Sequence, residues 1–94
     1  GGDELIIILR DLNVAANPQA IAAVAIEKLS TAFNYNETQL FIGASIGISI
    51  FPEHGIDADL LINRADFAMY EVKRTGGMGY KLYSLEMKEE YELV

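Results

Sequence analysis

The sequence predicts an α/β domain in which helices pack on a mixed sheet. Apolar runs typical of strands alternate along the chain with segments whose apolar residues recur every three or four positions, in the order strand, helix, strand, helix, strand. Apolar residues make up 51% of the 94 residues, which is enough for a hydrophobic core. A chain of this length suits one small domain and is too short for two.

The first half contains one expected strand and one expected helix. Leu5–Leu9 is an uninterrupted apolar run rich in β-branched isoleucine, which is typical of a strand covered on both faces. Residues 10–16 are expected to form a loop. Asn17 and Pro18 then make a favourable helix start, with Asn17 as N-cap and proline in the first helical position. The apolar stripe that follows predicts a helix ending near Asn34.

The second half begins with the clearest strand pattern. Residues 40–51 alternate bulky aliphatic side chains with small ones, and we expect the small face (Ser45, Gly47 and Ser49) to admit a close-packed helix rather than a ligand. Asp57 is the expected N-cap of a second helix, which residues 76–77 (Gly-Gly) terminate. Tyr80, Leu82 and Tyr83 suggest a short final strand, and residues 84–94 read as an acidic helical tail or linker.

Composition and charge exclude several classes of function. Fourteen acidic residues against seven Lys and Arg give a net charge of −7, which argues against binding a nucleic-acid polymer or an anionic membrane directly. Cysteine is absent, so neither disulfides nor thiolate metal sites are possible. The longest apolar run, Leu5–Leu9, is too short to span a membrane, and no secretory leader is visible. A cytoplasmic location is therefore expected.

The first four residues, Gly-Gly-Asp-Glu, are the strongest candidates for chemistry. Gly1 and Gly2 can form a tight turn and let a ligand approach the backbone closely. The neighbouring carboxylates of Asp3 and Glu4 could hold a hard cation such as Mg²⁺ together with substrate phosphates. Taken alone, the same residues also fit a solvated strand end.

Further motifs connect these four residues to a known family. Gly-Gly-Asp-Glu-Leu followed by an apolar strand resembles the GGDEF domain of diguanylate cyclases, with Leu5 in place of the name motif's Phe. The likeness covers about 83 of the 94 residues. It continues through Ser45–Ile48, the Phe-Pro-Glu-His-Gly-Ile-Asp segment at 51–57, Leu60-Leu61, Ala65-Asp66, Ala68-Met69-Tyr70 and Lys73.

The resemblance implies a fold, an activity and a set of site residues. Residues 1–83 would be the C-terminal half of a ferredoxin-like, nucleotidyl-cyclase-like domain whose sheet is largely antiparallel and incomplete as given. The family condenses two GTP into cyclic di-GMP and pyrophosphate, with each domain of a homodimer holding one GTP. Asp3 and Glu4 match the catalytic acids that ligate Mg²⁺ or Mn²⁺. Gly1 and Gly2 match the turn against the nucleotide, and Lys73 matches a lysine on the triphosphate.

Two departures from the family pattern leave the activity open. Gly77 and Met78 stand where the family usually has arginine and asparagine, and that arginine is a second phosphate contact. The residues that the family places before the signature hairpin are also missing, so we expect the 94 residues alone to be inactive and prone to self-association. The alternative is a degenerate module that binds GTP and regulates an attached domain. Residues 83–87 resemble a connector to EAL phosphodiesterase domains, and other domains could tether the parent to a membrane.

Two remaining polar residues are expected to be structural. His54 is predicted to be an exposed loop residue rather than a metal ligand, because no second ligand pattern accompanies it. Asp66 is expected on the surface of the second helix or in a structural hydrogen bond.

Overall fold

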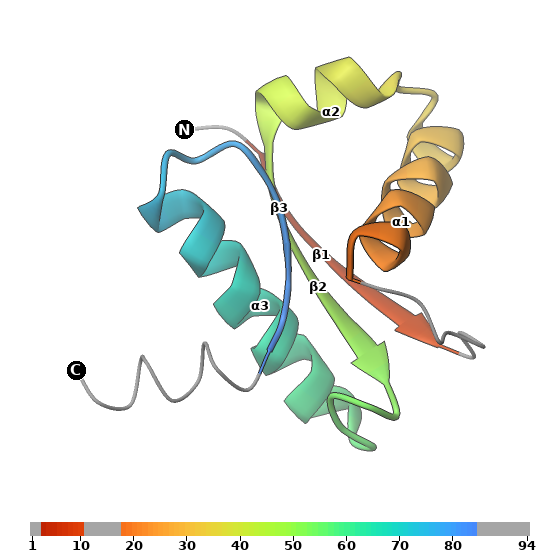
Figure 1. Cartoon of the computed structure of the whole chain (residues 1–94), viewed down its shortest axis with the longest axis vertical. Coiled ribbons are helices and arrows are strands. Elements are labelled where there is room, and N and C mark those ends of the chain that lie inside the picture. Colours follow the sequence, from red (N-terminus) through yellow and green to blue (C-terminus); the bar gives the residue numbers. More distant parts are fainter. Residues whose placement is uncertain (1–2, 11–17, 85–94) are drawn as a thin grey trace.

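The computed structural model describes residues 3–10 and 18–84. Two helices separate the first two strands of this part of the chain and one helix separates the last two, as Figure 1 shows. The elements are β1 (Asp3–Arg10), α1 (Pro18–Phe33), α2 (Glu37–Gly43), β2 (Ala44–Phe51), α3 (Ala58–Arg74) and β3 (Gly79–Leu82). Among the described helices, none has the length and hydrophobicity needed to cross a bilayer.

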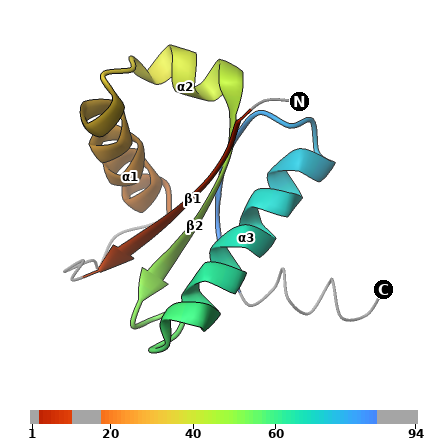
Figure 2. The same cartoon turned by 180° about the vertical axis from the view of Figure 1, so that it is seen from behind.

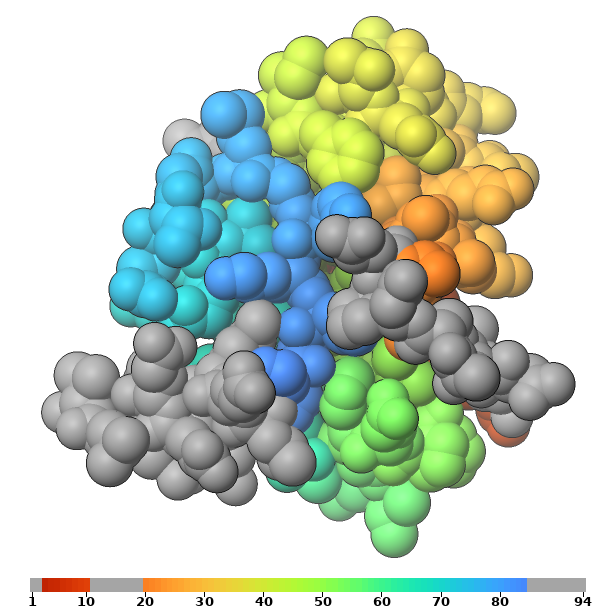
Figure 3. All heavy atoms as spheres, viewed as in Figure 1, coloured from red at the N-terminus to blue at the C-terminus, as the bar shows by residue number. Residues whose placement is uncertain are grey.

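The elements form three layers around a small sheet with the strand order β1-β2-β3. Helix α1 covers one face of the sheet and α3 the other, while α2 lies at the edge where the strands begin (Figures 1 and 2). β2 occupies the centre of the sheet, and β3 is visible at the surface between α3 and α2 (Figure 3). The predicted α/β class is therefore confirmed.

The prediction of a largely antiparallel sheet is wrong for the described strands. β1 and β2 run parallel, with Asp3 opposite Ala44, and β2 and β3 run parallel, with Ser45 opposite Gly79. Both connections contain helices, which carry the chain back to the edge of the sheet where the preceding strand began. A strand that starts again at the same edge must be parallel to its neighbour.

The strand expected over residues 40–51 is shorter than predicted, because residues 37–43 form α2. Asn36 caps this helix, since its side-chain oxygen accepts a hydrogen bond of 2.9 Å from the backbone N–H of Gln39. Glu37 lies in the first turn, where a carboxylate favours the helix dipole. Leu40 is buried from the helix rather than from a strand. β2 therefore begins at Ala44.

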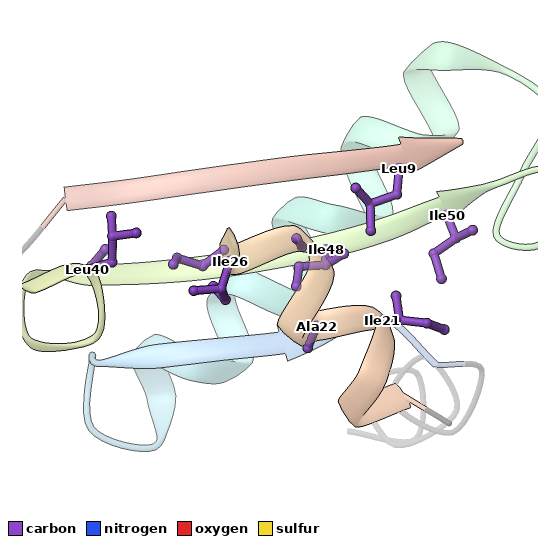
Figure 4. Close-up of a cluster of buried hydrophobic side chains, with 10 residues drawn as sticks. Leu9, Ile21, Ala22, Ile26, Leu40, Ile48 and Ile50 are labelled. Carbon is purple, nitrogen blue, oxygen red and sulfur yellow. The ribbon is translucent and has the colours of Figure 1, made fainter. Parts of the chain in front are cut away.

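The main core lies between the sheet and α1. Ile46 and Ile48 are fully buried in the central strand. Large aliphatic side chains and alanines from both layers meet there, as Figure 4 shows; the buried members are Leu9, Ile21, Ala22, Ala25, Ile26, Leu40, Ala44, Ile46, Ile48 and Ile50. This face of β2 is the bulky face predicted from its alternation.

The opposite face of β2 carries the small residues, and α3 packs directly on it. A Cβ atom added to Gly47 would lie 1.8 Å from the backbone oxygen of Ala65, so the helix touches the strand at this glycine. Asp57 caps α3 as predicted, accepting a hydrogen bond of 2.9 Å from the N–H of Asp59. The prediction that the small face admits a helix is confirmed.

Four predictions fall wholly or partly outside the described residues, and one of them is Asn17 as the N-cap of the first helix. The expected loop over residues 10–16 is described only at Arg10, which ends β1. Gly1 and Gly2 are outside the description, as are residues 85–94 of the expected tail.

Candidate functional site

The candidate site lies at the edge of the sheet where the strands begin. β1 starts there with Asp3 and Glu4. α3 follows β2 and leads into β3, so its direction is opposite to that of the strands and its last turn, with Lys73, reaches the same edge. The Lys73 ammonium and the Glu4 carboxylate form an ion pair across 69 residues of sequence.

The ion pair is half-exposed to solvent. The side chains of Lys73 and Glu4 are 48% and 49% exposed. Exposed pairs of this kind contribute only about 0–1 kcal/mol to stability. Separating Lys73 from Glu4 therefore costs the fold little.

Two pockets open at this edge, and Glu4 lines both of them. One, of about 390 Å³, lies beside the start of β1 and is lined by Asp3, Glu4, Leu5, Phe33, Tyr35, Gln39, Leu40, Gly43 and Ala44. The other, of about 520 Å³, lies beside the end of α3 and is lined by Glu4, Ile42, Gly43, Ser45, Lys73, Gly76, Gly77 and Met78. The second pocket combines a cation, a carboxylate and backbone from the turn after α3.

Asp3 and Glu4 are the acids that line the two pockets at this edge. Within the described residues, no group of three or more His, Cys, Asp or Glu side chains comes together. Two carboxylates nevertheless suit Mg²⁺, which commonly binds one or two protein carboxylates and completes its shell with waters and substrate phosphates. The donor set therefore fits such an ion when a phosphate substrate is present.

The turn after α3 contains Gly77, the residue that stands where the family usually has an arginine. The N–H of Gly77 donates to the carbonyl of Val72 at 3.0 Å and the N–H of Gly76 to that of Lys73 at 3.4 Å, which is a Schellman motif. Gly77 has φ of +83°, and a Cβ added there would meet nothing within 4 Å. Arg74 pairs instead with the carboxylate of Glu71 at 2.7 Å.

Ser45 lines this site, although the small face of the strand was expected to admit a helix rather than a ligand. Its hydroxyl donates a hydrogen bond of 2.7 Å to the carbonyl oxygen of Gly77. The Ser-Ile-Gly-Ile motif was the available signal, because a hydroxyl on the small face of a strand needs a partner once a helix covers it.

His54 lies at the opposite edge of the sheet, and the prediction that it is exposed is wrong. Its side chain is only 11% exposed, because the ring packs edge-on against Tyr83 with centroids 5.3 Å apart. Nδ1 accepts a hydrogen bond of 2.9 Å from the N–H of Ile50. Burial lowers the pKa of His54; the nearby charge of Glu53 opposes this shift and that of Arg64 adds to it.

Comparison with known proteins gives one family and several relatives. A family model described as "Diguanylate cyclase, GGDEF domain" matches residues 1–79. The chain is 38% identical to the signaling protein YkoW of Bacillus subtilis over 93% of its length, and 30% identical to the diguanylate cyclase TpbB of Pseudomonas aeruginosa over 99%. It is also 30% identical, over 93% of its length, to the bifunctional diguanylate cyclase/cyclic di-GMP phosphodiesterase MucR of Pseudomonas aeruginosa.

These relatives are much longer than the chain. It spans 11% of YkoW, 13% of MucR and 22% of TpbB. No solved structure matches the chain significantly.

Proposed function

Because the chain belongs to the GGDEF domain family of diguanylate cyclases, we propose that it forms the C-terminal part of a domain that condenses two GTP into cyclic di-GMP and two pyrophosphates. The single observation that carries this proposal is the meeting of Glu4 and Lys73 beside Asp3 at one edge of the sheet. A cation for phosphate and carboxylates for a metal are the two requirements of phosphoryl-type transfer.

Each site residue has a role in the proposed reaction. The ammonium of Lys73 binds the triphosphate as Glu4 is displaced from it. Asp3 accepts the proton of the ribose 3′-hydroxyl, whose oxygen then bonds to the α-phosphorus of the second GTP while the bond to pyrophosphate breaks. Gly1 and Gly2 let the nucleotide approach the backbone closely.

A divalent cation, Mg²⁺ or Mn²⁺, would be held by Asp3 and Glu4 and would neutralise charge on the phosphates when bound. The described acids supply oxygen donors alone, which is the ligand type that both ions prefer. The site offers groups for one nucleotide, so two GTP molecules require two sites. We therefore include a homodimer in the proposal, and a cytoplasmic location, where GTP is available.

The proposed activity is tested on the full-length protein with GTP and Mg²⁺, with cyclic di-GMP measured by mass spectrometry. We expect wild-type protein to make product and the double variant Asp3→Ala, Glu4→Ala to make none. Asp66→Ala is the matched control, since it removes an exposed carboxylate from α3 rather than from β1. Equal turnover by wild type and the double variant would refute the assignment of the acids.

The variant Gly77→Arg tests whether the lack of an arginine at this position lowers turnover, and Gly77→Ala is its control. Both replacements strain a backbone with φ of +83°, which costs about 1–2 kcal/mol, but neither side chain meets a neighbour at its Cβ. Only arginine adds a charge-assisted phosphate contact, worth about 1.5–3 kcal/mol. Higher turnover for Gly77→Arg than for Gly77→Ala supports a weakened cyclase. If neither variant makes cyclic di-GMP, the result supports a module that binds GTP and regulates an attached domain.

A further inference from the structure

Ser45 lies at the centre of the candidate site without having a chemical role in it. In the sheet it stands between Glu4 on β1 and Gly79 on β3. Its residue is 3% exposed, and its hydroxyl donates to the carbonyl oxygen of Gly77 at 2.7 Å. This bond joins the central strand to the turn that follows Lys73.

We propose that Ser45 is a positioning residue for the phosphate side of the site, an inference that rests on the proposed function. Ser45 holds the Gly76–Gly77 turn against β2. The turn then fixes the position of the last helical residues, including Lys73, beside Glu4. The hydroxyl of Ser45 donates to the turn, so its effect on the reaction passes through Lys73.

The turn needs such an anchor because its own bonds run back into the helix. The N–H groups of Gly76 and Gly77 are directed to the carbonyls of Lys73 and Val72, both within α3. Glycine is the residue with the greatest backbone freedom, and both glycines have positive φ. Among the hydrogen bonds of the described residues, the one from the Ser45 hydroxyl joins this glycine turn to the sheet.

Ser49 provides a natural control for Ser45. It lies four residues further along the same face of β2, and its hydroxyl donates to a backbone carbonyl of α3, that of Leu61, at 2.8 Å. Ser49 is fully buried and binds the first turns of α3, far from Lys73 at the other end of the helix. The two serines thus make the same kind of bond at opposite ends of one helix.

The test compares Ser45→Ala with Ser49→Ala in the full-length protein, measuring KM and kcat for GTP and the melting temperature. We expect Ser45→Ala to raise KM about fivefold, the factor that one hydrogen bond of typical net strength is worth, with less than a twofold change in kcat. Ser49→Ala should lower the melting temperature and leave KM within twofold. Ser45→Thr keeps the hydroxyl and should restore KM. Equal KM for both alanine variants, or no rescue by threonine, would overturn the inference.

A second readout separates this inference from the proposed function. Hydrogen exchange of the amides over residues 74–79 should be faster in Ser45→Ala than in wild type and unchanged in Ser49→Ala. This measurement needs no GTP, so it remains informative even if the wild-type protein makes no cyclic di-GMP. That absence of product would refute the proposed function and leave the positioning role untouched. Unchanged exchange over 74–79 in Ser45→Ala refutes the positioning role.

Discussion

Replacing Gly47 by alanine tests whether close packing of α3 on β2 holds the fold together. The added Cβ would lie 1.8 Å from the backbone oxygen of Ala65 and 2.5 Å from the backbone nitrogen of Met69. Backbone atoms cannot rotate away as the end of a side chain can, so the helix itself must move. Ordinary contact begins at 3.4 Å, which requires a shift of about 1.6 Å (3.4 minus 1.8) at Ala65.

A shift of that size has consequences beyond the clash. Overpacking alone costs about 1–3 kcal/mol. The bonds from Ser45 to Gly77 and from Ser49 to Leu61, at 2.7 and 2.8 Å, would both stretch and lose about 1 kcal/mol each. The expected loss is therefore about 3–5 kcal/mol, which is a large part of the roughly 5–15 kcal/mol that stabilises a typical domain.

The loss is measured as the change in unfolding free energy from urea denaturation followed by circular dichroism. Gly43→Ala is the matched control, because a Cβ added at Gly43 meets nothing within 4 Å. We expect the control to change the free energy of unfolding by less than about 0.5 kcal/mol, as do most substitutions that touch nothing. If Gly47→Ala unfolds at the same urea concentration as Gly43→Ala, the helix does not rest on the strand at this glycine.

Two further predictions concern the opposite edge of the sheet. The folded-state pKa of His54 is lowered below its usual value, so its contribution to stability is complete above about pH 6.5 and is lost as the pH falls through the folded pKa. His54→Asn keeps an acceptor for the Ile50 N–H but cannot titrate, so its unfolding free energy should fall less between about pH 7.5 and pH 5; parallel profiles would contradict this. Asp57→Ala removes the N-cap of α3 and should cost about 1 kcal/mol in urea denaturation, whereas Asp57→Asn, which keeps an accepting oxygen, should cost much less.

Local signals in the sequence were sufficient to define α3. Asp57 marks its start because a capping carboxylate accepts a hydrogen bond from an N–H group two or three residues away. Gly76 and Gly77 mark its end because positive φ is required there and glycine adopts it freely. Both signals act within a few residues, so they can be recognised in the sequence without knowledge of the rest of the fold.

The errors arise where tertiary contacts decide between alternatives. The alternation over residues 40–43 fits a strand, yet Leu40 is equally well buried from a short helix capped by Asn36. Strand direction likewise depends on where each connection returns to the sheet, which no local pattern encodes. The burial of His54 depends on Tyr83, which is 29 residues further along the chain and directly follows β3.

The candidate site was predicted mainly from its motifs, and the structure supplies the physical link between them. α3 is 17 residues long, and a slip of one residue along β2 would shift it by about 1.5 Å and turn it by about 100°. Such a slip would carry Lys73 away from Glu4. Close contact at Gly47 and one hydrogen bond near each end of the helix, from Ser45 and Ser49, hold its register on the strand. Residues with no chemistry of their own therefore determine whether the lysine meets the carboxylate.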